Sequence, residues 1–270
     1  SAYRMVALDL DGTTIGRDLT LHPAVPAAVA AARAAGIMVT IATGRMYGST
    51  LPFARQLGID APLICYQGAL IRHPGDGTTL AHWGMPAAAA AEAARDLIAA
   101  GICTIAYVGE TLFAATHSPE LDTYLGYHPD EVDIRIDPDL ARVFATTPPT
   151  KLLFVAEPEV VDRELARLAP IFGDRLALLR SHTHFGELTA LGVSKGAALA
   201  RLAAQSGIAR EHVLAIGDQE NDLSMITWAG LGLAVANAVP AVRAAAAAVV
   251  PSVAEAGGAG GIRPYCLQEV

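Results

Sequence analysis

Residues 5–13 read MVALDLDGT: four apolar residues run directly into two aspartates and a glycine. Met5–Leu8 is too short and too uniformly apolar for an amphipathic helix, so it predicts a buried strand. In an open α/β sheet, ligands bind at the carboxyl ends of the strands. Asp9 and Asp11 therefore follow the strand at the place where such a sheet carries its chemistry. A simple Asx-type turn is the alternative, because Asp-Gly is common in turns.

Outward from this stretch, apolar segments alternate with helical ones. The first part of the chain predicts a helix at 23–35, a strand at 37–42, a helix at 49–57 and a strand at 63–66. The same alternation returns late, with helices at 194–206, 222–229 and 240–247 and strands at 213–216 and 231–235. Strands that alternate with helices predict βαβ units on a parallel sheet. We therefore expect a doubly wound, Rossmann-like α/β core.

Between these two parts the composition changes. From about His82 to Phe185 the chain holds more Tyr, Phe, His and Pro, and its strands are less uniformly apolar. Helices are predicted at 87–100 and 158–169, and strands at 102–108, 112–115, 151–156 and 176–180. This pattern predicts an α+β domain of residues 83–187, inserted into an α/β core made of residues 1–82 and 188–270.

The bulk composition excludes several classes of protein. With 53% apolar and 17% charged residues, the chain is not disordered. Much of the apolar share is alanine, and no apolar run is long enough to span a membrane. Three scattered cysteines without a CxxC pair argue against a disulfide framework or a zinc site. A net charge of −8 without a Lys/Arg cluster argues against nucleic acid as a partner. We expect a cytoplasmic globular protein whose oligomeric state cannot be read from sequence.

A second acidic motif, Gly217-Asp218-Gln219-Glu220-Asn221-Asp222, follows the predicted strand at 213–216. A loop that leads into a capped helix would explain it by itself, since Asn221 or Asp222 can cap a helix. Two acidic motifs that both follow strands favour a shared site instead. Hard oxygen ligands from separate strands, with no His or Cys nearby in sequence, are suited to Mg²⁺.

Two further motifs suggest anion binding. Thr43-Gly44-Arg45 follows the predicted strand at 37–42, where a hydroxyl and backbone N–H groups at a strand-to-helix turn can bind an anion. Lys195 lies at the start of the predicted helix at 194–206, although a cation there opposes the helix dipole. A bound phosphate would favour a lysine at this position; a solvated surface lysine is the alternative.

Together these motifs resemble those of the haloacid dehalogenase-like (HAD) phosphatase superfamily, and specifically its Cof-like branch with a large inserted cap (type IIB). The resemblance covers essentially the whole chain and rests on four motifs in one order: Asp9-x-Asp11-Gly12-Thr13, Thr43-Gly44-Arg45, Lys195 and Gly217-Asp218-x-x-Asn221-Asp222. Two segments depart from the branch. Gln67-Gly68-Ala69 stands where Asn-Gly-Ala is usual, and residues 257–262, GGAGGI, replace an Asp-Gly-Val type segment.

The resemblance implies a Mg²⁺-dependent phosphatase that attacks phosphorus with the Asp9 carboxylate and forms an aspartyl-phosphate. It implies Asp11 as the general acid and base, and metal ligands from the Asp9 carboxylate, the Asp11 main-chain carbonyl and the Asp218 carboxylate. The implied substrate-binding residues are Thr43, Gly44, Arg45, Lys195 and Asn221. Asp222, and Asn221 with it, would orient Lys195 and metal-bound water. The implied substrates are small phosphorylated metabolites, with sugar phosphates first and cofactor phosphates next.

Two alternatives stay open at this point. A phosphotransferase or phosphomutase would show the same Asp9 and Asp11. A catalytically silent ligand-binding protein on this fold is disfavoured, because Asp9, Asp11, Lys195 and Asp218 are all present. In the predicted inserted domain and at its first junction, surface or packing roles are expected for the single His and aromatic residues His82, Trp83, His117, His128, His182, His184 and Phe185.

Overall fold

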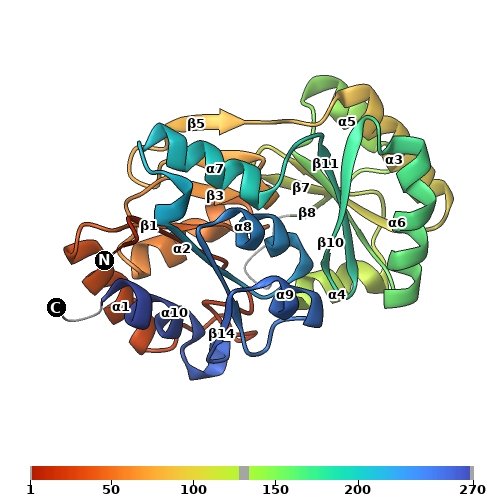
Figure 1. Ribbon diagram of the computed structural model, residues 1–270. Coiled ribbons are helices and arrows are strands. Elements are labelled where there is room, and N and C mark those ends of the chain that lie inside the picture. The colour runs from red at the N-terminus through yellow and green to blue at the C-terminus, as the bar shows by residue number, and fades with distance from the viewer. Residues whose placement is uncertain (1, 128–133, 268–270) are drawn as a thin grey trace. The chain divides into compact units, whose positions relative to one another are not determined.

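A computed structural model of the chain describes residues 2–127 and 134–267 and divides into two compact units (Figure 1). One unit comprises residues 1–82 together with 194–270, and the other comprises residues 83–193. The second junction therefore lies at 193/194 rather than at the predicted 187/188. The reason is that residues 185–190 form one continuous strand, β11, which pairs on both of its edges within the second unit.

A five-stranded parallel sheet forms the centre of the first unit, as the α/β prediction required. Its order is β14 (Ala248–Val250), β13 (Leu231–Val235), β12 (Val213–Gly217), β1 (Met5–Leu8) and β2 (Met38–Ile41). All four residues of β1 are fully buried, and strands β12 and β2 pair with its two edges. Strands β1 and β12 are neighbours, with Leu8 opposite Ile216. The residues that follow them, Asp9 and Asp218, therefore leave the sheet side by side.

The helices of the first unit are α1 (Ala24–Ala34), α2 (Tyr47–Gln56), α7 (Lys195–Gln205), α8 (Leu223–Trp228), α9 (Pro240–Ala245) and α10 (Gly257–Cys266). Short 3₁₀ turns occur at η1 (Tyr66–Gly68), η2 (Arg210–His212), η3 (Glu220–Asp222) and η4 (Val253–Glu255). Helix α10, beside α1 in Figure 1, was not predicted and consists largely of the glycine-rich segment. A Cβ at Gly261 would lie 2.2 Å from Ile216 Cδ1. The glycines therefore let this helix pack closely against the sheet.

The strand predicted at 63–66 exists, but it does not extend the parallel sheet as a full strand. β3 (Leu63–Cys65) pairs antiparallel with β4 (Leu70–Arg72), which pairs with β5 (Thr79–His82). Its link to the parallel sheet is an isolated bridge between Ala42 and Ile64. The chain reverses through η1 directly after β3, which the apolar pattern of the strand could not show.

The second unit is an α+β layer. Its sheet has the order β10 (Leu176–His182), β11 (Phe185–Ala190), β9 (Lys151–Val155), β6 (Cys103–Val108), β7 (Thr111–Ala114) and β8 (Ile134–Ile136), antiparallel except between β7 and β8. Its helices are α3 (Ala87–Ala99), α4 (Pro119–Tyr127), α5 (Leu140–Thr146) and α6 (Pro158–Phe172). Leu97, Phe144 and Leu168 from α3, α5 and α6 share an apolar core with Leu152 and Phe154 of β9. This unit therefore has a core of its own.

The histidines of this unit divide between packing and surface positions. The rings of Tyr127 and His182 lie 4.5 Å apart between centroids, and those of His182 and His184 lie 5.9 Å apart. His117 is exposed and its Nε2 lies 3.5 Å from a carboxylate oxygen of Asp122. His128 lies outside the described residues.

Across residues 2–127 and 134–267, no helix combines the length and the apolar character that crossing a bilayer requires.

Candidate active site

The loop after β1 folds tightly around Asp9. The Thr14 hydroxyl donates to the Asp9 main-chain oxygen at 2.6 Å, and the Thr14 N–H donates to the Leu10 oxygen at 2.9 Å. Gly12 turns the loop at a φ of +81°, and a Cβ there would lie 2.5 Å from Asp218 Oδ2. Glycine is therefore needed at this position for its backbone conformation and for the close approach of Asp218.

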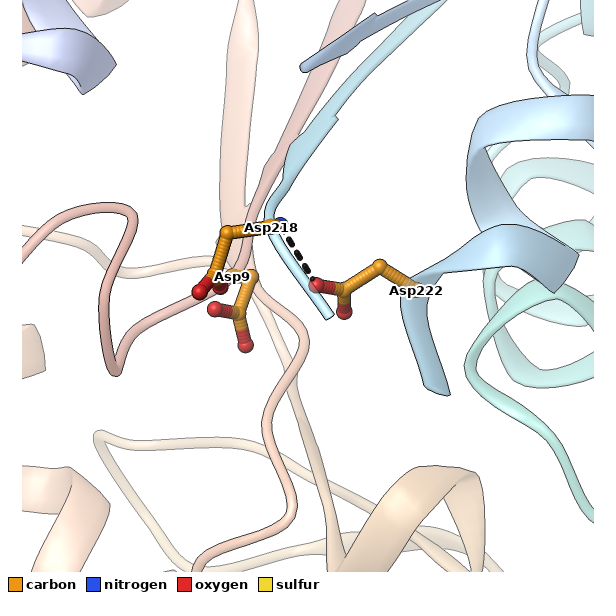
Figure 2. A group of neighbouring side chains, drawn as sticks. All are labelled: Asp9, Asp218 and Asp222. Atoms are coloured by element: carbon orange, nitrogen blue, oxygen red, sulfur yellow. Dashed lines mark hydrogen bonds between the residues drawn. The ribbon is translucent and has the colours of Figure 1, made fainter. Parts of the chain in front are cut away.

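Three buried carboxylates meet at the ends of β1 and β12. Asp9, Asp218 and Asp222 each offer an oxygen within 4.8 Å of the others, and Figure 2 shows Asp9 and Asp218 beside one another. Burial, with the negative charge of Asp222, raises the pKa of Asp9 to about 7 against the opposing charge of Lys195. Burial also raises the pKa of Asp218 well above its ordinary value, and the charges of Asp9 and Asp222 add to this effect. The cluster holds more negative charge than its surroundings stabilise.

Lys195 lies inside this cluster and not at the surface. Its Nζ donates to Asp9 Oδ1 and to Asp222 Oδ1, both at 2.6 Å, and the side chain is 1% exposed. Burial by itself lowers the pKa of a lysine, but the charges of Asp222 and Asp9 outweigh it, so the pKa of Lys195 is raised. The two carboxylates stabilise a cation at the start of α7, where the helix dipole disfavours it.

Asp222 is fully engaged by the protein. Its Oδ2 accepts hydrogen bonds from the N–H groups of Asp218 at 2.8 Å and Gln219 at 3.0 Å, and its Oδ1 accepts from Lys195 (Figure 2 shows the bond from Asp218). A Cβ at Gly217 would lie 2.6 Å from Asp222 Oδ2, so glycine at 217 leaves space for this carboxylate. Asp222 thus shapes the acidic loop and contacts Lys195.

Asp218 is oriented by two side chains, Thr13 and Gln219. Its Oδ1 accepts from the Thr13 hydroxyl at 3.0 Å, and its Oδ2 accepts from Gln219 Nε2 at 3.2 Å. Asn237 steadies the same loops, since its Nδ2 donates to the Gly12 oxygen at 2.8 Å and its Oδ1 accepts from the Val253 N–H at 2.8 Å. Residues from the early and the late part of the chain therefore fix the loops that carry Asp9 and Asp218.

Asp11 and Arg45 form a two-pronged ion pair. Arg45 Nε donates to Asp11 Oδ2 at 2.8 Å and Arg45 Nη2 donates to Asp11 Oδ1 at 2.7 Å. The Arg45 side chain is buried, whereas that of Asp11 is 44% exposed. Thr43, also buried, accepts from the Arg45 N–H at 3.1 Å and so shapes the loop that carries the arginine. Sequence had grouped Arg45 with the substrate-binding residues; its partner here is Asp11.

Asn221 contacts Gln67, which is not among the predicted site residues. Its Nδ2 donates to Gln67 Oε1 at 2.9 Å, and Gln67 is 2% exposed. The end of the Gln67 side chain lies against Gly44, where a Cβ would be 2.4 Å from Gln67 Nε2. In the sequence, Gln67 stands out only because Gln-Gly-Ala replaces the usual Asn-Gly-Ala. This difference does not indicate that Gln67 contacts Asn221.

The donor set fits a hard divalent cation. Asp9, Asp218 and Asp222 bring three carboxylates against the one ammonium group of Lys195, all of them buried. Asp222 is occupied by main-chain N–H groups and by the lysine, so Asp9 and Asp218 are the carboxylates suited to a metal. Oxygen ligands are those that Mg²⁺ prefers.

Comparison with known proteins connects this geometry to a family. A family model described as haloacid dehalogenase-like hydrolase matches residues 6–260. A pyridoxal phosphate phosphatase of Escherichia coli is 30% identical over 272 aligned positions, covering 92% of this chain and 93% of its own. A 5-amino-6-(5-phospho-D-ribitylamino)uracil phosphatase of Bacillus subtilis is 25% identical over 249 positions, 88% of each chain. A solved HAD subclass IIB sugar phosphatase shares the fold, with a TM-score of 0.82 at 20% identity over 97% of this chain and 98% of that one.

Proposed function

Because this chain belongs to the haloacid dehalogenase-like hydrolase family, we propose that it is a phosphatase that hydrolyses monoesters of small phosphorylated metabolites. One observation carries the proposal: the buried Asp9 carboxylate lies at the end of β1, held by Lys195 and grouped with Asp218. A nucleophile, a fixed cation and a second acidic ligand are what in-line attack on a phosphate monoester requires.

Asp9 is the nucleophile in this proposal. The bond from Lys195 Nζ to Asp9 Oδ1 fixes the direction of the carboxylate, so attack on phosphorus starts from a set geometry. The step forms an O–P bond to Asp9 and breaks the bond to the leaving alcohol, giving an aspartyl-phosphate that water then hydrolyses. Asp9, Asp218 and the main-chain carbonyl of Asp11 would hold Mg²⁺, which reduces repulsion between the carboxylate and the phosphate dianion.

Asp11 is the general acid and base. It lies two residues beyond Asp9, and its role here is to give a proton to the leaving oxygen. Its ion pair with Arg45 must open before Asp11 can give a proton to that oxygen. We therefore assign Arg45 the role of holding Asp11 in a waiting position. The turn at Thr43 and Gly44 and the ammonium of Lys195 would bind phosphoryl oxygens.

The substrate is proposed only as a class. Relatives are named for pyridoxal phosphate and for a phosphoribitylamino-uracil, and sequence resemblance ranked sugar phosphates first. The role of the unit of residues 83–193 as a cap that selects the substrate stays a prediction of the resemblance.

The decisive experiment is a phosphate-release assay. The wild-type protein is given sugar phosphates, pyridoxal phosphate and p-nitrophenyl phosphate, each with Mg²⁺ and with EDTA, beside Asp9→Asn and the surface control Asp174→Asn. We expect Mg²⁺-dependent release by the wild type and Asp174→Asn, and none by Asp9→Asn. Release that persists in folded Asp9→Asn would contradict the nucleophile. Phosphate transferred to an added sugar in place of water would instead identify a phosphotransferase.

A further inference from the structure

The 3₁₀ turn η1 carries an uncommon backbone next to the site. Tyr66 and Gln67 have φ values of 51° and 61°, the left-handed region that residues other than glycine seldom adopt. Two main-chain bonds fasten the turn to the loop after β2: the N–H of Tyr66 donates to the Arg45 oxygen and that of Gln67 donates to the Thr43 oxygen, both at 3.0 Å. Strained backbone of this kind persists only where its surroundings hold it.

Gly68 brings the same turn against the start of α7. Its φ is +102°, and a Cβ there would lie 2.3 Å from the main-chain oxygen of Ser194, the residue before Lys195. The turn η1 is therefore packed between the loop that carries Thr43 and the helix that begins at Lys195.

From this turn the Gln67 side chain runs inward across Gly44. The end of its amide lies where a side chain at position 44 would have to be, so glycine at 44 makes room for it. Beyond Gly44 it reaches the acidic loop, where Gln67 Oε1 accepts from Asn221 Nδ2 at 2.9 Å. One buried side chain thus touches two of the sequence motifs that are far apart in the chain.

Because Asn221 Nδ2 donates to Gln67, the Asn221 atom that remains without a hydrogen-bond partner in the described part of the chain is Oδ1. Asn221 Oδ1 is buried and has no hydrogen-bond partner among the described residues. An amide oxygen is only an acceptor, and the oxygens of a phosphate dianion are acceptors as well. The partner that satisfies Asn221 Oδ1 is therefore a hydrogen donor or a cation and not a bare phosphoryl oxygen. The O–H of a water molecule or of a substrate hydroxyl is such a donor.

We infer that Gln67 is a positioning residue that sets the amide of Asn221, so that Asn221 presents its oxygen as the acceptor for an O–H group at the active site. The effect of Gln67 on catalysis rests on the proposed function. Its effect on the orientation of the Asn221 amide does not. The inference gives a role to Gln67, the residue that departs from the Asn-Gly-Ala pattern. It also makes an O–H group, and not a phosphoryl oxygen, the partner of Asn221 Oδ1.

The orientation is tested without turnover, by NMR of the Asn221 side-chain amide, assigned by its loss in Asn221→Ala. Gln67→Glu keeps an acceptor at the end of a side chain of equal length, whereas Gln67→Met removes it. We expect the Asn221 N–H₂ signals to keep their hydrogen-bonded shift and slow exchange in Gln67→Glu, and to lose both in Gln67→Met. If the Asn221 N–H₂ signals of Gln67→Met are the same as those of the wild type, then Asn221 Nδ2 does not donate to Gln67 and the inference is overturned.

The catalytic part is tested by a double-mutant cycle on kcat/KM. Gln67→Met is expected to lose about tenfold, the effect of one hydrogen bond, mainly in kcat. The double variant Gln67→Met/Asn221→Ala should lose no more than Asn221→Ala alone, because both act through one amide. Fully additive losses would overturn the role of Gln67.

Folding is controlled separately. Gln67→Gly removes the side chain at a φ that suits glycine, so its thermal unfolding shows whether losses in Gln67→Met come from the backbone. If Gln67→Gly is as stable as the wild type and still loses activity as Gln67→Met does, the side chain is responsible; if it keeps full activity, the inference is wrong. A wild type without phosphatase activity would end the proposed function and leave the NMR result to stand by itself.

Discussion

Lys195 shows how one residue sets the charge of the site. It contacts Asp9 and Asp222 at 2.6 Å each, in a position where almost no side-chain surface is exposed. A buried ammonium group needs such partners, and buried carboxylates need a cation. Because Lys195 neutralises only part of the cluster, the pKa values of Asp9 and Asp218 are raised, and a divalent cation would stabilise their ionised forms.

The Asp11 assignment makes a specific kinetic prediction. In Asp11→Asn the side chain no longer delivers a proton, so turnover should fall by about 10²–10⁴-fold with alkyl phosphates, whose leaving groups need protonation. With p-nitrophenyl phosphate, whose leaving group is stable as an anion, the loss should be much smaller. Single-turnover kinetics on both substrates measures this difference. Equal losses would show that Asp11 is not the acid.

The raised pKa of Asp9 predicts how stability depends on pH when divalent cations are removed. The folded protein keeps a proton on Asp9 up to about pH 7, whereas the unfolded chain releases it near 3.8. The folded state then binds more protons, so the contribution of Asp9 to stability is complete below pH 3.8 and is lost as the pH rises through about 7.

Thermal unfolding in EDTA between pH 5 and pH 8 measures this effect. We expect the Tm of the wild type to fall relative to that of Asp9→Asn, by several degrees on the order-of-magnitude relation between free energy and Tm. Parallel pH profiles of the two proteins would show that Asp9 has an ordinary pKa in the folded state.

At the scale of elements, the loops after β1 and β12 depend on glycine for their fit. Gly12 and Gly217 each lie so close to a carboxylate that a Cβ would be 2.5 Å from Asp218 Oδ2 and 2.6 Å from Asp222 Oδ2, respectively. The two strands only bring the loops to the same edge of the sheet. The approach of the β1 loop to Asp218 depends on the absence of a side chain at Gly12, and the fold of the β12 loop onto its own Asp222 depends on the absence of one at Gly217.

Gly12→Ala is therefore expected to impair activity more than stability alone explains, and Gly36→Ala is its matched control. Gly12 and Gly36 have φ of +81° and +78°, but nothing lies within 4 Å of a Cβ at Gly36. Both variants should lose about 1 kcal/mol from the backbone. Only Gly12→Ala should displace Asp218 and weaken Mg²⁺ binding, as measured by calorimetry. Equal Mg²⁺ affinity in the two variants would contradict the packing argument.

On the scale of the whole molecule, each unit has its own core and the acidic site belongs to one of them. The parallel sheet of the first unit carries Asp9 and Asp218, while Phe144 and its neighbours form the core of the second unit. The three carboxylates of the acidic cluster, Asp9, Asp218 and Asp222, all belong to the first unit.

Phe144→Ala tests this independence. Loss of a buried phenyl ring should cost about 3–5 kcal/mol of unfolding free energy. The affinity for Mg²⁺, measured by calorimetry below the unfolding transition, should stay unchanged, because none of the described residues of the second unit takes part in the acidic cluster. A large fall in Mg²⁺ affinity in the folded variant would show that the second unit supports the metal site.

The sequence by itself determined the parallel sheet and the place of its acids. Short apolar strands are local patterns, and strands followed by Asp9 and by Asp218 end at one edge of a parallel sheet. Only the tertiary structure decided which side chains meet. The bond of Lys195 to Asp9 spans 186 positions, and that of Asn221 to Gln67 spans 154. No local pattern encodes such pairs, because they depend on how separate loops pack.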